Sequence, residues 1–166
     1  MLAQPAAPPG SQISAGDGLT TELYSVFASE IVRWDRLADR GDAQRKDARA
    51  SRHHFKEELT LTDKEEAILK RTMHSCADST AAWQAAQKAL LDGFKAQNPK
   101  GAKLSPELSQ QLQQNLVARV QLILSCVDSL RSALGAATFQ KVDHYVRTAV
   151  RSRTAVVSVP TGGSAK

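Results

Sequence analysis

The sequence predicts an all-α fold, a helical bundle built on one long antiparallel hairpin. Residues that favour helices, such as Ala, Leu, Gln, Lys and Arg, are abundant, whereas aromatic residues make up only 5% of the 166 residues. Apolar residues recur every three or four positions over long segments, which is the period of one helix face. Short motifs that typically begin helices precede the two longest of these segments.

Composition divides the chain into three parts. Residues 1–18 are rich in Pro, Ala, Gly and Ser, and we expect a flexible leader there. Residues 19–152 carry the helical periodicity and form the predicted helical domain. Residues 153–166 are rich in Thr, Val, Gly and Ser and predict a flexible tail. The leader resembles the stretch that often follows a removed export signal, so we expect a periplasmic or secreted protein, with cytoplasmic residence as the alternative.

Three shorter helices flank the predicted hairpin. The first spans residues 20–40, with Gly41 as a natural C-terminal stop. Its apolar face carries Leu23, Phe27, Ile31, Trp34 and Ala38. The next segment is highly charged, and it predicts a loop followed by a short amphipathic helix over residues 47–58. The last helix is predicted over residues 137–151, because Gly135 breaks the helix before it.

The hairpin itself is predicted from two helix starts and one short connection. Thr62 to Glu65 form a capping box, S/T-x-x-E, that begins a helix over residues 62–97. Ser105 and Pro106 begin a second helix over residues 105–134, which has the wider apolar face and which we expect to be the most buried. The short connection forces the two helices to pack antiparallel. We expect the following side chains to serve the core: Trp34, Trp83, Phe94, Leu112, Val120 and Phe139.

The two cysteines lie at equal distances from the predicted turn. Cys76 precedes Gly101 by 25 positions and Cys126 follows it by 25, so antiparallel packing places them level on neighbouring helices. A disulfide forms if the two Cβ vectors converge. The alternative is a pair of buried thiols that act as small apolar side chains. Both interpretations stay open, and the absence of a C-x-x-C spacing disfavours a redox-active pair.

A basic segment is the one candidate anion-binding face. It contains Arg33, Arg36, Arg40, Arg45, Lys46, Arg49, Arg52 and Lys56. Such a face could bind the phosphates of a nucleic acid or an anionic membrane surface. Four acids are interleaved with it, at Asp35, Asp39, Asp42 and Asp47, and they favour instead a solvated face with local ion pairs.

No pattern in the sequence indicates a catalytic, cofactor or metal site. The common nucleophile, phosphate-loop, dinucleotide and zinc-protease motifs are absent. His53 with His54, and His74 with Cys76, are one and two positions apart, directions that diverge on a helix. We therefore predict a protein that is not an enzyme. No apolar run reaches the length of a membrane-spanning helix, so no transmembrane segment is expected.

The two predicted helix openings resemble those of a known group of proteins. Leu61 to Glu65 reads LTDKE and Leu104 to Leu108 reads LSPEL, similar to the L-T-x-x-Q openings of the periplasmic Spy and CpxP-like stress proteins, with Glu65 and Leu108 in place of Gln. The chain also resembles other small helical proteins that bacteria export. The resemblance to the Spy and CpxP-like proteins implies a chaperone or sensor, whereas the resemblance to the other exported proteins implies no activity.

From these observations we expect an exported, non-enzymatic protein-interaction or chaperone/sensor-like module. Its partner is then another protein or a second copy of the chain. The alternative is a nucleic-acid-associated helical module that uses the basic segment over residues 33–56. Steep salt dependence of nucleic acid binding would favour the alternative.

Overall fold

The computed structural model describes residues 15–44, 47–98, 101 and 103–154, and it confirms the all-α prediction: within these ranges the chain forms helices and no strand. The elements follow in the order α1 (Ala15–Ala43), α2 (Arg49–Arg52), α3 (His54–Leu59), α4 (Asp63–Gln97), α5 (Pro106–Leu134), α6 (Ala136–Tyr145), the short π-helix η1 (Val146–Val150) and α7 (Arg151–Arg153). The predicted hairpin is α4 and α5.

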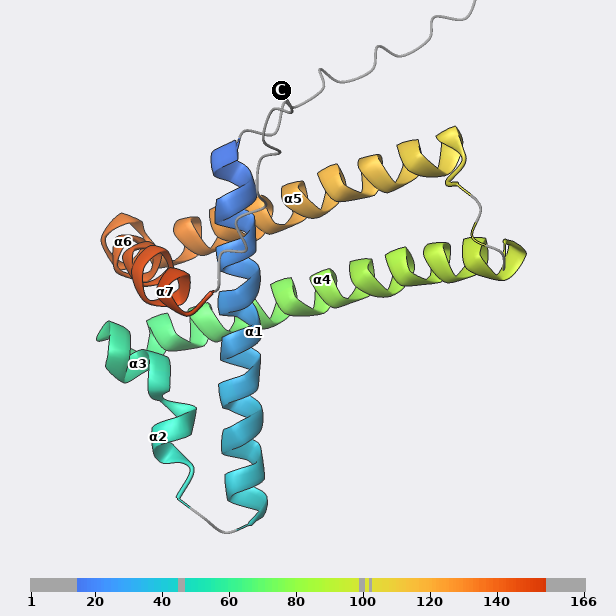
Figure 1. The fold of residues 1–166 in the computed structure, drawn as a ribbon. Coiled ribbons are helices and arrows are strands. Elements are labelled where there is room, and N and C mark those ends of the chain that lie inside the picture. Colours follow the sequence, from blue (N-terminus) through green and yellow to red (C-terminus); the bar gives the residue numbers. More distant parts are fainter. Residues whose placement is uncertain (1–14, 45–46, 99–100, 102, 155–166) are drawn as a thin grey trace, which may run out of the picture.

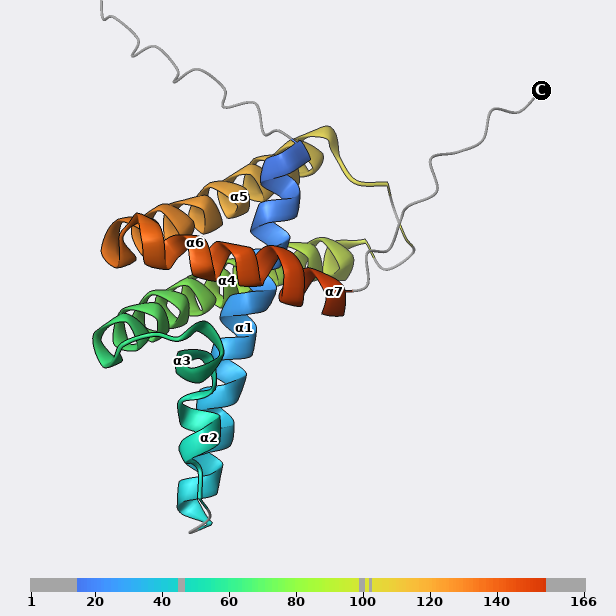
Figure 2. The ribbon, with the colours of Figure 1, turned by 90° about the vertical axis from the view of Figure 1, so that its left-hand side faces the viewer.

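The helices form a cross rather than a parallel bundle. α4 and α5 lie side by side and antiparallel, and α1 crosses both at a steep angle (Figure 1). The C-terminal half of α1 continues beyond the hairpin, with α2 alongside it, and α3 leads back to the start of α4 (Figures 1 and 2). α6 returns from the end of α5 and packs against α5 and α3, and η1 packs against α1. One end of the hairpin is therefore enclosed by other helices, and the other end extends away from them.

The enclosed end contains the core, and we call it the base. Phe27 of α1 lies at its centre. Its ring makes an edge contact with Phe55 at 5.4 Å and a tilted contact with Tyr145 at 5.9 Å between ring centroids. Around these rings pack the fully buried apolar side chains of the long helices. They are Ile31 from α1, Leu69 and Met73 from α4, Ile123 and Leu130 from α5, and Val142, Val146 and Val150 from α6 and η1.

One buried hydrogen bond joins α1 to α6. The hydroxyl of Tyr24, which is 1% exposed, donates to a carboxylate oxygen of Asp143 at 2.9 Å, and Arg147 donates to the other oxygen of Asp143 at 2.7 Å. Burial, and then the bond to Asp143, raise the pKa of the Tyr24 hydroxyl far above its ordinary value. The phenol therefore stays protonated and keeps donating at any physiological pH.

Both predicted helix caps are confirmed. The Thr62 hydroxyl accepts from the amide of Glu65 at 3.3 Å, and the Glu65 carboxylate accepts from the amide of Thr62 at 2.8 Å, which completes the capping box. The Ser105 hydroxyl accepts from the amide of Leu108 at 3.1 Å. These caps satisfy amides that a helix start leaves without partners.

The first helix is longer than predicted at both ends. It begins at Ala15, so residues 15–18 of the predicted leader belong to it, while residues 1–14 lie outside the described residues. Gly41 does not stop it, because α1 continues to Ala43. A Cβ atom at position 41 would lie 2.9 Å from the Cβ of Ala48, so glycine here permits close approach of the chain before α2.

Two further boundaries differ from the predictions. The helix predicted over residues 47–58 is two shorter helices, α2 and α3, separated at His53, where the backbone leaves the helical region. The last helix runs from residue 136 to 153 and includes a π-helical turn. That wider turn is compatible with the four-residue spacing of Val142, Val146 and Val150, all of which are buried. The predicted tail from residue 155 onward lies outside the described residues.

The prediction that the second hairpin helix is the most buried was wrong. α5 has three buried residues, Ile123, Val127 and Leu130, all in its C-terminal half. Of the six side chains expected in the core, Phe139 is buried and the other five are half-buried: Trp34, Trp83, Phe94, Leu112 and Val120. The reason is that α1 and α6 cover one half of the hairpin. None of the described helices has the length and apolar character needed to cross a membrane.

Candidate functional site

Helix α1 carries its charges on two separate faces. Asp35, Asp39 and Asp42 lie four and three positions apart and share one face. Arg33, Arg36 and Arg40 lie three and four positions apart and share another. Acids and bases that alternate in the sequence are thus kept apart in space.

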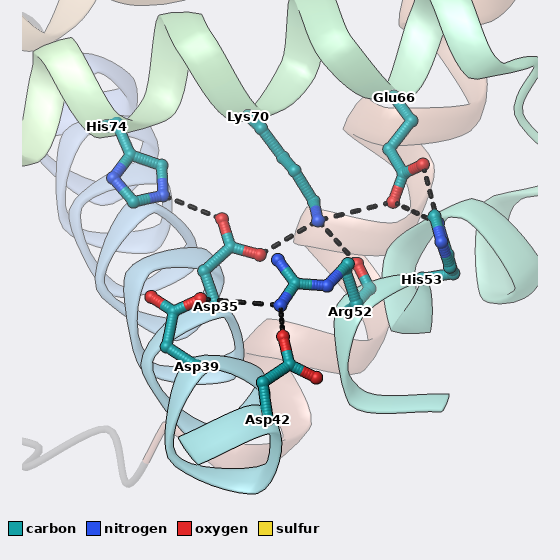
Figure 3. Close-up of polar contacts among 8 residues, drawn as sticks. All are labelled: Asp35, Asp39, Asp42, Arg52, His53, Glu66, Lys70 and His74. Atoms are coloured by element: carbon teal, nitrogen blue, oxygen red, sulfur yellow. Dashed lines mark hydrogen bonds and ion pairs between the residues drawn. The ribbon is translucent and has the colours of Figure 1, made fainter. Parts of the chain in front are cut away.

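The acidic face of α1 is neutralised by residues from other helices (Figure 3). Asp35 accepts from Lys70 at 2.8 Å and lies 2.8 Å from Nε2 of His74, both on α4. Arg52 of α2 pairs with Asp39 and Asp42. No carboxylate of this face is left to pair with the arginines on the other face of α1.

A buried carboxylate links this face to α3. Glu66 is 6% exposed, and its carboxylate lies 2.9 Å from Nδ1 of His53 and 3.3 Å from Nζ of Lys70. Lys70 also donates to the backbone carbonyl of Arg52, so its ammonium group bonds three acceptors, as many as it has hydrogens (Figure 3). We call Asp35, His53, Glu66, Lys70 and His74 the junction cluster. It joins three segments by satisfied polar contacts and has the character of a structural clamp.

The two adjacent histidines point in different directions. His53 contacts Glu66, whereas the ring of His54 stacks on Trp34 with centroids 4.1 Å apart and planes 19° apart. This stack covers part of Trp34, which explains why that residue is half-buried at the edge of the core. Across the described ranges no group of three or more His, Cys, Asp or Glu side chains is arranged to hold a metal ion.

The basic face of α1 lines a groove against α4. Arg33, Arg36 and Arg40 form no ion pair with any described residue, and the groove beside them has a volume of about 960 Å³. Its other lining residues are Glu22, Ser25, Val26, Ala28, Ser29, Glu30, Val32 and Leu37 of α1, Ala77, Asp78, Thr80, Ala81 and Gln84 of α4, and Arg119 of α5. Three unpaired guanidinium groups are therefore presented along one wall.

One end of the groove is fixed by a contact between α5 and α1. Arg119 donates to Glu22 at 2.6 Å and to the hydroxyl of Ser25 at 3.3 Å, and its guanidinium lies 5.8 Å from the ring centroid of Trp83. Glu30 pairs with Arg153 at 3.1 Å. Two of the three acids that line the groove are therefore already paired, and Asp78 is exposed with no partner among the described residues.

The predicted basic segment does not form one continuous face. Arg33, Arg36 and Arg40 line the groove, whereas Arg52 pairs with acids of α1 and Lys56 pairs with Asp63. Arg49 is exposed on α2. Arg45 and Lys46 lie outside the described residues. The interleaved acids therefore neutralise part of the segment, as the local ion-pair interpretation expects, and leave three arginines of α1 unneutralised.

The cysteines lie level across the hairpin, as the turn arithmetic predicts. The Cα atoms of Cys76 and Cys126 are 5.9 Å apart, and the pair lies at disulfide distance. Cys76 belongs to the core, whereas Cys126 is half-buried beside it. The pair lies where the base ends.

Beyond this pair the hairpin continues as an arm, which we define as residues 84–97 of α4 and 106–118 of α5 (Figure 1). No described residue of the arm is buried. Its larger apolar side chains are half-buried or, at Leu116, exposed: Leu90, Leu91, Phe94, Leu108, Leu112, Leu116 and Val117. Trp83 donates to the carbonyl of Asn115 at 2.9 Å, and the Asn115 side-chain amide donates to Gln87 at 2.9 Å. These hydrogen bonds join α4 to α5 at the end of the arm nearest the base.

Sequence reasoning missed the junction cluster and Arg119. A signal for Glu66 was present, because it precedes Leu69 by three and Met73 by seven and so shares their buried face. Lys70 follows Glu66 by four, the spacing of a helical ion pair. Nothing local pointed to Arg119, whose partner Glu22 is 97 positions away.

Comparison with known proteins identifies no relative that could assign a role to the groove, the junction cluster or the arm. No family model, no curated protein and no solved structure matches the chain.

Proposed function

We propose that this protein is a non-enzymatic, exported interaction module that binds another protein, with a chaperone-like or sensor-like role. The observation that carries the proposal is the arm. It extends two long helices into solvent. Its apolar side chains are covered on one side by the facing helix, and no third helix among the described residues packs over them.

The arm is suited to protein binding because it presents apolar side chains to solvent. Leu116 is 49% exposed on α5, and Leu104, in the connection, is 45% exposed. Apolar side chains presented in this way gain free energy when a partner removes them from water, by about 25 cal/mol per Å² of surface. A partner protein, or a second copy of the chain, would complete the missing layer.

Export is supported by the cysteine pair. Disulfides persist in oxidising compartments such as the periplasm and are rare in the cytoplasm. Cys76 and Cys126 lie at disulfide distance, so the fold accommodates the bond without rearrangement. Mass spectrometry of unreduced protein from its native host tests this part. We expect a mass lower than that of the dithiol by two hydrogen atoms, and two free thiols would contradict export.

Binding to an unfolded protein tests the interaction role. The probe is reduced, alkylated α-lactalbumin, and complex formation is measured by fluorescence anisotropy at low and high salt. We expect binding that changes little with salt. Leu116→Ser should weaken it about fivefold, because each apolar contact contributes of the order of 1 kcal/mol. Leu19→Ser is the matched control, since Leu19 is 38% exposed but lies on α1. Equal effects of the two variants would contradict a role for the arm.

A second function is favoured by the unpaired arginines. Arg33, Arg36 and Arg40 on one helix face could bind nucleic acid phosphates, as the sequence alternative expects. In that case duplex DNA or RNA should bind with an affinity that falls steeply with salt. Reduced, alkylated α-lactalbumin should then not bind.

A further inference from the structure

We propose that the groove between α1 and α4 binds an acidic, amphipathic helix of a partner protein. Arg33, Arg36 and Arg40 would pair with its carboxylates, and Leu37 would contact its apolar side. The inference rests on the proposed protein-binding function and deepens it by naming the chemistry of the partner segment. It uses a surface whose lining shares only Gln84 with the arm.

The first step is the charge that the groove leaves unbalanced. The acids on the opposite face of α1 bond Lys70, His74 and Arg52, so none of them compensates the three arginines. Glu22 and Glu30 are paired with Arg119 and Arg153. Three cations against the single unpaired Asp78 leave a local excess of positive charge. An anionic partner is therefore the one that this wall recognises.

The second step is the apolar content of the same groove. Val26, Val32, Ala77 and Ala81 line it, and Leu37 is 40% exposed beside the arginines. A nucleic acid backbone has no apolar face to contact these side chains. A protein segment with carboxylates on one side and apolar side chains on the other matches both parts of the lining.

The third step is the spacing. Arg33 and Arg40 are separated by seven positions, or about 10 Å along the helix axis. Carboxylates at matching intervals of three and four positions on a helix that runs along α1 would reach all three guanidinium groups. Residues 1–14 and 155–166 contain no Asp or Glu, so neither terminal segment of this chain supplies such side chains.

The probe for this inference is a synthetic helical peptide of about 18 residues, long enough to be appreciably helical in water. It carries glutamates at intervals of three and four on one face and leucines on the adjacent face. A peptide of the same composition in scrambled order is its control. Binding of each labelled peptide to the full chain is measured by fluorescence anisotropy, with duplex DNA as a third probe.

The decisive variants remove the same charge from two places. The triple variant R33Q/R36Q/R40Q should weaken peptide binding about tenfold or more. The triple variant R49Q/R71Q/R151Q removes three exposed arginines outside the groove and should change the affinity for the peptide less than twofold. Leu37→Ser should weaken it about threefold and Leu19→Ser should not. Circular dichroism checks that each variant is folded.

Three results would overturn the inference. The first is equal binding of the ordered and scrambled peptides, and the second is equal weakening by the two triple variants, which would indicate bulk charge. The third is DNA binding that depends on Arg33, Arg36 and Arg40 in a chain that does not bind the peptide. If only the assay with reduced, alkylated α-lactalbumin fails, the proposed protein-binding role of the arm is wrong. If only the assay with the acidic peptide fails, the proposed role of the groove is wrong.

Discussion

The two halves of the α4–α5 hairpin have the same sequence pattern and different surroundings. In the base, Leu69, Met73 and Ile123 are fully buried. In the arm, Leu90 and Leu112 occupy equivalent positions of the apolar face and are half-buried. The difference is that α1 and α6 pack on the base and stop short of the arm (Figure 1). Helical periodicity thus predicts which face meets the partner helix, but a third element decides whether that face becomes a core.

The largest expected effect comes from truncating the same residue type in each half. Leu69→Ala should lower the free energy of unfolding by about 3 kcal/mol, because it leaves a cavity in a fully buried site. Leu90→Ala should lower it by about 1 kcal/mol, because water already reaches that side chain. Urea denaturation followed by circular dichroism measures both. Equal losses would show that the arm is covered in solution, for instance by a second copy.

The cysteine pair marks the border between the halves and gives the next effect. With the bond formed, Cys76 and Cys126 close a loop with a sequence separation of 50, and C76A/C126A should lower the free energy of unfolding by about 3 kcal/mol. Thiol labelling of the unfolded, unreduced protein should detect no free cysteine. A reducing agent should destabilise the wild type and leave the double variant unchanged. Two labelled thiols per chain would remove the basis of this prediction.

The junction cluster allows the contribution of a buried charge to stability to be compared with that of an exposed charge. Glu66→Gln should cost about 2 kcal/mol of unfolding free energy, because it removes the charged partner of Lys70 and His53 at a buried site. Asp63→Asn breaks the exposed pair with Lys56 and should lower the free energy of unfolding clearly less than Glu66→Gln does, because water screens an exposed pair. Urea denaturation of both variants measures the difference. A reversed order would mean that the cluster contributes little to joining α1, α3 and α4.

The smallest effect concerns Glu65, where α4 meets α6. Its pKa is lowered to about 2 because the hydroxyl of Thr138, and then the amide and hydroxyl of Thr62, donate to its carboxylate. The unfolded pKa is near the ordinary value of 4.5, so the ionised carboxylate stabilises the fold above pH 4.5 and this contribution is lost as the pH falls towards 2.

Urea denaturation between pH 7 and pH 2 tests this dependence. The stability difference between the wild type and Glu65→Gln should be full above pH 4.5 and shrink below it. Thr138→Val removes the largest cause of the lowered pKa of Glu65. It should therefore narrow the pH range over which this stability difference changes. A difference that stays constant with pH would show that the carboxylate is not held by these donors.

Local sequence patterns predicted well which helices form. They predicted poorly where the helices end and which other helices they contact. The caps at Thr62 and Ser105, the antiparallel hairpin and the level position of the cysteines all follow from short-range rules, and the structure shows each of them. The continuation of α1 through Gly41 depends on Ala48, seven positions away, and no helix rule contains that contact. Propensity therefore placed the helices better than it placed their ends.

The charged residues show the same limit more clearly. Interleaved acids and bases between residues 33 and 56 suggested local neutralisation. Asp35 instead pairs with His74, 39 positions away, and with Lys70. Arg33, Arg36 and Arg40 therefore have no ion-pair partner among the described residues. Whether two neighbouring opposite charges pair depends on which helix packs against each face. That information lies in the tertiary structure, and the groove could not be predicted without it.

The position of the cysteine pair has a topological consequence. A bond between Cys76 and Cys126 turns the outer part of the hairpin into a covalent ring that contains the whole arm. Proteolytic cleavage in the connection around Gly101 would open this ring without releasing a fragment. A nicked molecule would migrate as one species without reductant and as two with it. The protein could thus be cut at its most distant point from the core and still remain a single molecule.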